Sequence, residues 1–133
     1  MKLLIYDVSI TGYYSEYISY LVNYIHDNTD GNYFYFAVFG NDYPKTEQTE
    51  GFTTQYFGKI DDNITLSLIY SAADVMVVPS IMEAFGQSAS EAIAYGTPVV
   101  AFNIVGLSDI VEHKENGYLA KAYDTVELAR GIQ

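Results

Sequence analysis

Two glutamates are the side chains whose position in this sequence most suggests chemistry. Glu83 lies in a loop that follows a short apolar run, and Glu91 comes after seven intervening residues, about one turn inside a predicted helix. The N–H groups at the start of a helix attract anions, so this helix could face a diphosphate. Taken singly, each glutamate is more often an ordinary solvated side chain, because isolated charges favour the surface.

A second candidate for anion binding follows the first predicted strand, at residues 2–7. Ser9, Thr11 and Gly12 lie after this strand, in a short loop before a helical pattern. Their hydroxyl and N–H groups could cradle a phosphate at the start of that helix. A tight turn with a helix cap accounts for the same residues equally well.

Strand and helix patterns alternate along the whole chain. Strands are predicted at residues 2–7, 33–39, 55–57, 75–78 and 98–101, and helices at residues 13–25, 61–70, 88–95 and 124–133. Residues 42–51 are expected to form a surface loop, residues 109–112 one helical turn and residues 116–117 a turn. This alternation predicts right-handed crossovers and an open, mostly parallel sheet. Ligands of such sheets lie beyond the carboxyl ends of the strands, which here means residues 7–12, 79–87 and 103–109.

The composition predicts one folded domain and excludes several kinds of partner. The 133 residues are 50% apolar and carry 6 Lys plus Arg against 17 Asp plus Glu, a formal charge of −11. Such a charge repels phosphate backbones and anionic lipids, so no nucleic-acid partner is expected. There is no cysteine, which excludes disulfides and thiol-bound zinc. No apolar run approaches the roughly 18 residues of a membrane span, and we expect a cytoplasmic protein.

The two histidines do not suggest a metal site. His26 and His113 are far apart in the sequence and have no ligand-like companions. Metal ligands usually occur in clusters with short, fixed spacings. We therefore predict no metal.

Tyrosines are concentrated in the first predicted helix. Tyr13, Tyr14, Tyr17, Tyr20 and Tyr24 are more than a single core-facing stripe requires. Tyrosine is enriched at protein interfaces, so a homodimer through this surface is one interpretation. Solvated tyrosines are the other.

The region around the two glutamates resembles the donor-site signature of retaining GT-B glycosyltransferases. The resemblance rests on residues 71–80 (SAADVMVVPS), 83–86 (EAFG), 91–92 (EA) and 96–100 (GTPVV), and it covers roughly residues 34–133. It implies an α/β fold, a three-layer Rossmann-like domain with a mostly parallel sheet, which is one half of a GT-B fold. It also implies a nucleotide sugar as substrate, with no separate cofactor.

The resemblance assigns roles to five residues. Glu83 would contact the donor sugar, and Phe85 and Gly86 would present backbone N–H groups to sugar and phosphate. Gln87 would belong to the same nucleotide-sugar site, and Glu91 would hold the ribose hydroxyls. A carboxylate suits a vicinal diol because it accepts two hydrogen bonds at once.

The sequence departs from the family pattern where catalysis would need it. An enzyme of this kind has two Rossmann-like domains, and 133 residues have room for one. Residues 9–14 lack the Arg and Lys that would neutralise the leaving diphosphate, and Val105 precedes Gly106 where two glycines are usual. We therefore expect a nucleotide-sugar-binding domain that is incomplete as an enzyme alone. The alternative is a non-catalytic α/β fragment or engineered domain that keeps the fold.

The amino-terminal segment resembles a different part of the family. Residues 1–32 look like the first strand and helix of an acceptor domain, whereas residues 33–133 look like a donor domain. We interpret residues 1–133 as a single domain in which residues 3–6 take the sheet position of the donor domain's own first strand. This hypothesis requires the first strand to lie beside residues 75–78 rather than at an isolated edge.

Overall fold

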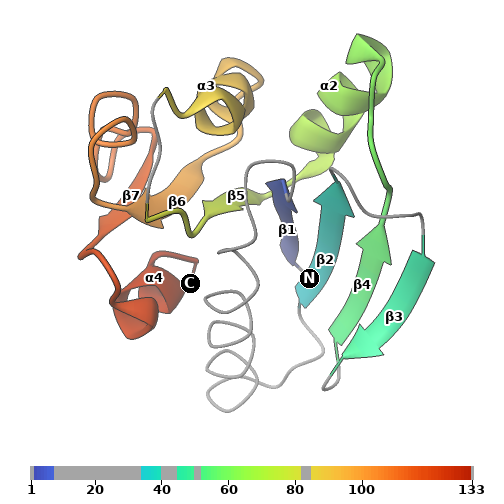
Figure 1. Ribbon diagram of the computed structural model, residues 1–133, viewed down its shortest axis with the longest axis horizontal. Helices are drawn as coiled ribbons and strands as arrows, with labels where there is room; N and C mark the ends of the chain where they lie inside the picture. Colours follow the sequence, from blue (N-terminus) through green and yellow to red (C-terminus); the bar gives the residue numbers. More distant parts are fainter. Residues whose placement is uncertain (1, 8–33, 40–44, 50–51, 82–84, 133) are drawn as a thin grey trace.

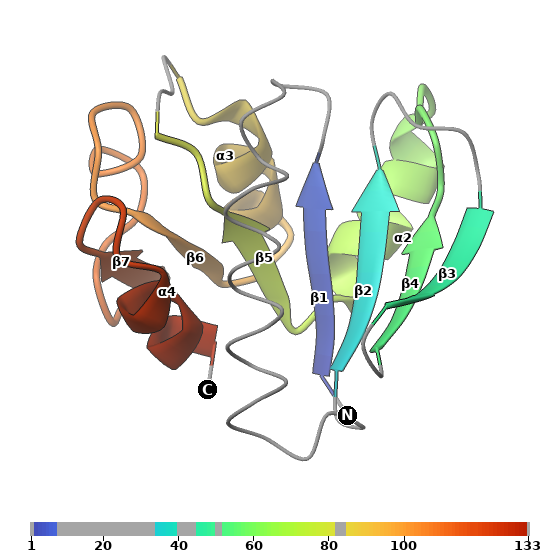
Figure 2. The ribbon, with the colours of Figure 1, turned by 60° about the horizontal axis from the view of Figure 1, so that its bottom comes forward.

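The computed structural model describes residues 2–7, 34–39, 45–49, 52–81 and 85–132, and its strands form one seven-stranded sheet (Figure 1). The strands are β1 (Lys2–Asp7), β2 (Phe34–Phe39), β3 (Lys45–Thr49), β4 (Phe52–Tyr56), β5 (Val75–Val78), β6 (Val99–Phe102) and β7 (Gly117–Ala120). The described helices are α2 (Asn63–Ala72), α3 (Gln87–Ala94) and α4 (Thr125–Ile132). Because α2 and α3 cover one face of the sheet and α4 lies on the other, the predicted three-layer α/β fold is confirmed (Figure 1, Figure 2).

β1 lies in the middle of the sheet although it comes first in the chain. The strand order is β3-β4-β2-β1-β5-β6-β7, and every neighbouring pair is parallel except β3 with β4. β1 pairs with β2 along its whole length and with β5 at Leu4 and Ile5 (Figure 2). The amino-terminal strand therefore lies beside residues 75–78, as the hypothesis of a replaced strand requires.

The core lies between the centre of the sheet and the layer of α2 and α3. β5 and β6 are buried along their whole length, as is usual for central parallel strands covered on both faces. Tyr70, Met76 and Leu107 are large side chains of this core with almost no exposed surface. On the other face, α4 packs against β6 and β7. Among the helices in the described ranges, none has the length and apolar character needed to cross a membrane.

Three helix ends follow the signals that the sequence predicted. The Asp62 carboxylate accepts a hydrogen bond from the Thr65 N–H at 2.7 Å and caps α2. This bond lowers the pKa of Asp62, because it favours the charged form. Asp124 accepts from the Glu127 N–H at 2.9 Å where α4 begins. Gly96 follows α3 with a left-handed φ of 83°, which glycine adopts without a side-chain clash.

The prediction of a surface loop over residues 42–51 is wrong. Lys45–Thr49 forms β3, an edge strand that pairs antiparallel with β4. β4 also begins earlier than predicted, at Phe52. An edge strand has one side open to water, so a polar sequence such as that of β3 is compatible with it. The threonines of β3 and β4 favour extended backbone, but the charged and polar residues between those of β3 are typical of a loop.

The segment between β6 and α4 also differs from the prediction. The helical turn expected at residues 109–112 lies earlier, since the Ser108 N–H donates to the Ile104 carbonyl and the Val111 N–H to the Leu107 carbonyl, both at 2.9 Å. The turn expected at residues 116–117 covers residues 114–116, and β7 begins at Gly117. β7 was not predicted because its four residues carry no alternating pattern.

Candidate functional site

The carboxyl edge of the sheet between β1 and β5 is the expected ligand site of this topology. From β1 the chain continues to β2 on one side, and from β5 it continues to β6 on the other. Open α/β sheets bind ligands in the crevice where the strand order reverses in this way. The described residues of the segment that leaves β5 and leads into α3, residues 79–81 and 85–86, therefore lie at the edge where this topology binds ligands.

The start of α3 is built around Gly86. This residue is the N-cap of the helix and has a left-handed backbone (φ 57°, ψ 43°). A Cβ placed on Gly86 would lie 2.8 Å from Ile110 Cδ1 and 3.2 Å from the Gly106 carbonyl oxygen. The loop after β5 is thus held against the segment after β6, and two of the three predicted ligand loops meet here. Phe85, beside Gly86, is 85% exposed.

The first turn of α3 has the electrostatic character of an anion site. It contains no acidic residue, and its N-cap residue is a glycine. The first N–H groups of a helix have no intrahelical partners, and the helix dipole adds partial positive charge at this end. A phosphate group is the kind of ligand that suits such a helix start.

Glu91 is oriented by hydrogen bonds on both of its oxygens. Oε2 accepts from the Tyr70 hydroxyl at 3.1 Å, and Oε1 accepts from the side-chain amide of Gln87 at 3.2 Å. Glu91 is half-buried, so it is not the fully solvated side chain that a lone glutamate usually is. α3 supplies Gln87 and Glu91 one turn apart, and the neighbouring α2 supplies Tyr70.

The sequence did not reveal the bond between Tyr70 and Glu91, which are 21 residues apart. Tyr70 ends the helix predicted at residues 61–70, but no spacing rule shows where its hydroxyl points. Gln87 lies four residues before Glu91 on one helix, and that spacing does bring two side chains together.

Several predicted site residues lie outside the described residues. These are Glu83, Ser9, Thr11 and Gly12, together with the five tyrosines of the predicted first helix. A site that combines Glu83 with Glu91, and a phosphate loop after β1, therefore stay predictions.

No Lys or Arg lies among the described residues of the predicted ligand loops 79–87 and 103–109, and Lys114, later in the segment after β6, lines a cavity at the amino ends of the strands. Lys59, which follows β4, pairs with Asp61 at 3.3 Å, and both side chains are exposed. Lys121 follows β7, at the far edge of the sheet. Val105 is 82% exposed, so its side chain projects into solvent beside Gly106.

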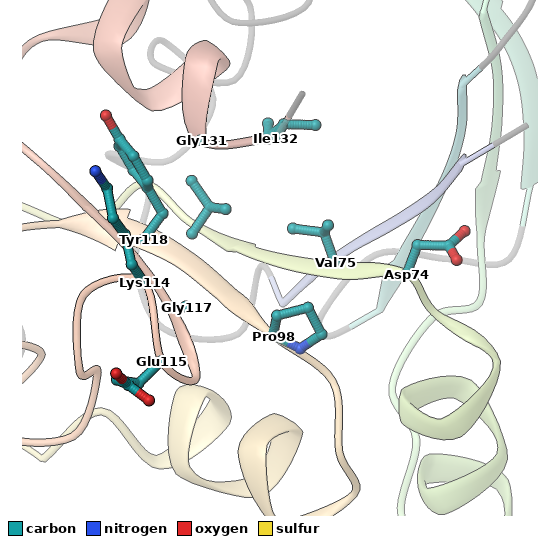
Figure 3. Close-up of a pocket in the computed structure, with 10 residues that line it drawn as sticks. Asp74, Val75, Pro98, Lys114, Glu115, Gly117, Tyr118, Gly131 and Ile132 are labelled. Atoms are coloured by element: carbon teal, nitrogen blue, oxygen red, sulfur yellow. The ribbon is translucent and has the colours of Figure 1, made fainter.

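A cavity of about 510 Å³ lies at the opposite edge of the sheet. Asp74, Pro98 and Gly117 line it where the chain enters β5, β6 and β7, and Tyr118 and Ile132 also line it (Figure 3). Because ligands of this fold bind at the carboxyl ends of the strands, a cavity at their amino ends is not the candidate site.

A family model matches most of the described fold. Residues 45–133, well over half of the chain, match the family described as glycosyl transferases group 1. The chain belongs to the glycosyl transferases group 1 family. The matched region includes α2, α3 and the hydrogen-bonded Glu91.

Two curated relatives of this group 1 chain match about half of it. An uncharacterized glycosyltransferase of Methanocaldococcus jannaschii is 43% identical over 68 residues, which are 51% of this chain and 17% of that protein. A D-inositol 3-phosphate glycosyltransferase of Rhodococcus jostii is 43% identical over 65 residues, which are 49% of this chain and 14% of that protein. The match thus spans less than one fifth of the length of these relatives.

Solved structures of longer glycosyltransferases share the fold of this group 1 chain. The pneumococcal O-GlcNAc transferase GtfA has a TM-score of 0.74 and 22% identity, over 98% of this chain and 28% of that chain. The sucrose-phosphate synthase of Thermosynechococcus elongatus has a TM-score of 0.69 and 26% identity, over 99% of this chain and 35% of that chain. These matches cover nearly all of this chain, including β1, and support a Rossmann-like half of a GT-B fold.

Proposed function

We propose that this chain supplies the nucleotide-sugar site of a group 1 glycosyltransferase. The donor binds at the carboxyl edge of β1 and β5, with its diphosphate at the start of α3. The observation that carries the proposal is the Glu91 carboxylate, which Tyr70 and Gln87 hold about one turn inside a helix that begins after Gly86. A nucleoside diphosphate combines the anion that a helix start attracts with the ribose diol that a carboxylate binds.

Each site residue has a separate part in this proposal. Glu91 binds the ribose hydroxyls, and Glu83 contacts the donor sugar. Phe85 and Gly86 present backbone N–H groups to sugar and phosphate, and the missing Cβ of Gly86 lets this loop pack closely against the segment after β6. Gln87 supports the site through its hydrogen bond to Glu91.

The reaction that we propose for the complete protein is transfer of a hexose to a glycan or lipid-linked acceptor. Departure of a nucleoside diphosphate develops negative charge, and preorganised cations stabilise such a transition state by several kcal/mol. No Lys or Arg lies among the described residues of the predicted ligand loops 79–87 and 103–109, and residues 9–14 contain none in the sequence. The acceptor site would come from a further domain, and because residues 9–14 lack the Arg and Lys of the family pattern, we propose that this chain alone does not turn over.

UDP is the first nucleotide to test. GtfA, which has a similar fold, was solved in complex with UDP and GlcNAc, and the similar HepE protein of Anabaena was solved with UDP and glucose. Both neighbours are below 25% identity to this chain, so their nucleotide is a starting point for the assay rather than an assignment.

The experiment is a thermal-shift titration of the 133-residue chain with UDP, GDP and ADP and with their sugar derivatives. A ligand at a hundred times its dissociation constant adds about 2.7 kcal/mol of stability, which raises the melting temperature by several degrees. Glu91→Ala should abolish this rise. Glu115→Ala is the matched control, because Glu115 lines the cavity at the opposite edge of the sheet. No rise with any ligand would favour the alternative, a non-catalytic α/β domain that keeps only the fold.

Two further parts of the proposal do not depend on the donor site. We propose a cytoplasmic location and a homodimer through the tyrosine-rich segment of residues 13–24, since tyrosine is enriched at interfaces. A strictly monomeric mass at high protein concentration would refute the dimer.

A further inference from the structure

We infer that Tyr70 is a positioning residue for Glu91: its buried hydroxyl holds the carboxylate so that each oxygen keeps one acceptor site for a ribose diol. The inference rests on the proposed function. It adds a residue that does not touch the ligand and still determines how well the diol is held.

The Tyr70 ring is fixed from several sides and has no exposed surface. Phe39 of β2 packs edge-on against it with 5.9 Å between ring centroids, and Tyr95 stacks on it at 5.8 Å. The Thr97 hydroxyl donates to the Tyr70 backbone carbonyl and ties the end of α2 to the segment before β6. A ring packed in this way offers its hydroxyl to Glu91 from one direction, which is what preorganised binding requires.

The acceptor sites of Glu91 can be counted. An ionised carboxylate offers about four of them, two on each oxygen. Tyr70 occupies one on Oε2, and Gln87 occupies one on Oε1. One site remains on each oxygen, and a vicinal diol has two hydroxyls to donate. Without the Tyr70 hydroxyl, Gln87 would be the remaining donor of this pair, and its side chain is exposed.

The hydrogen bond also has a purely structural explanation, because a buried phenol hydroxyl needs a partner. The two explanations predict different results when the hydroxyl is deleted. If the bond serves only the fold, Tyr70→Phe changes the affinity for every ligand of the site equally. If the bond positions Glu91, Tyr70→Phe weakens only those ligands that carry a ribose diol.

Calorimetric titration with a ribonucleoside diphosphate and its 2′,3′-dideoxy counterpart separates these explanations. UDP, GDP and ADP are each compared with their dideoxy forms. We expect the wild type to prefer the ribose form and Glu91→Ala to bind both forms equally. In Tyr70→Phe the preference for the ribose form should fall about tenfold, which corresponds to about one hydrogen bond. Its affinity for the dideoxy form should equal that of the wild type.

Tyr95→Phe is the matched control, because it deletes a neighbouring hydroxyl and keeps the ring stacked on Tyr70. It should keep the full preference, and melting curves check that each variant is folded. If Glu91→Ala abolishes the preference and Tyr70→Phe keeps it, or loses affinity equally for both forms, the positioning role is overturned and the donor site stands. If the wild type shows no preference with any base, the proposed ribose contact of Glu91 fails, and the positioning role fails with it.

Discussion

Replacing Gly86 with alanine adds a methyl group where the structure leaves little room. The backbone there is left-handed (φ 57°), which costs a residue with a Cβ about 1–2 kcal/mol. The new Cβ would also lie 2.8 Å from Ile110 Cδ1 and 3.2 Å from the Gly106 carbonyl oxygen. The Ile110 side chain can rotate away, but the backbone oxygen cannot, so the loop before α3 must shift.

Gly96→Ala is the matched control for the size of this effect. Gly96 is also left-handed (φ 83°), but no atom lies within 4 Å of the position that its Cβ would take. It should therefore lose only the backbone contribution, about 1–2 kcal/mol. Overpacking adds about 1–3 kcal/mol, and the movable Ile110 side chain places Gly86→Ala near the lower end, at about 2–3 kcal/mol in total.

Urea unfolding of the wild type and the two variants measures this difference. We expect unchanged slopes and a lower midpoint for Gly86→Ala than for Gly96→Ala. Equal midpoints would refute the argument that the loops after β5 and β6 are held together at Gly86. Gly86→Ala should also weaken nucleotide binding, whereas Gly96→Ala should not, because Gly96 follows the other end of α3.

Three further substitutions test other parts of the structure. Asp62→Ala should lower the melting temperature at pH 7, because the cap of α2 is lost, whereas the neighbouring Asp61→Ala should not. Since the pKa of Asp62 lies below its ordinary value of 3.8, the stabilisation is present above that value and is lost as the pH falls through the folded-state pKa. A difference in melting temperature between Asp62→Ala and the wild type that persists in strong acid would contradict this. Thr97→Val should cost about 1 kcal/mol in urea unfolding, because a buried hydrogen bond to the Tyr70 carbonyl is lost, and an unchanged midpoint would argue against that bond. Phe85→Ala should change stability by less than about 0.5 kcal/mol and leave nucleotide affinity unchanged, since Phe85 is 85% exposed and only its N–H is assigned a role; a loss of affinity would mean that the ring itself contacts the donor.

The central strands and the helix ends could be predicted because their signals are local. β5 and β6 are apolar runs next to prolines, and Asp62 and Gly96 are residue types that are favoured at the start and after the end of a helix. The edge strands β3 and β7 could not be recognised in the same way. Their extended form comes from pairing with β4 and β6, and a polar or mixed run does not reveal such a partner.

The sequence likewise predicted the position of the main site residue but not the direction of its side chain. The position of Glu91 on a helix that begins at the carboxyl edge follows from the order of the elements. The direction of its carboxylate does not, because it depends on how α3 packs beside α2. The contact between Gly86 and Gly106 is likewise a product of the packed fold, since no sequence rule joins two loops 20 residues apart.

The central place of β1 affects the order in which the fold can be completed. Within the described residues, β1 is the strand that joins β3, β4 and β2 to β5, β6 and β7. Its partners in β5 come about 70 residues later in the chain. At about 5–20 residues per second, a newly made β1 waits on the order of several seconds for β5 to be synthesised. During that time one edge of β1 is unpaired, and unpaired strand edges associate with other chains. The strand that unites the sheet is therefore also the place where a nascent chain is most open to aggregation.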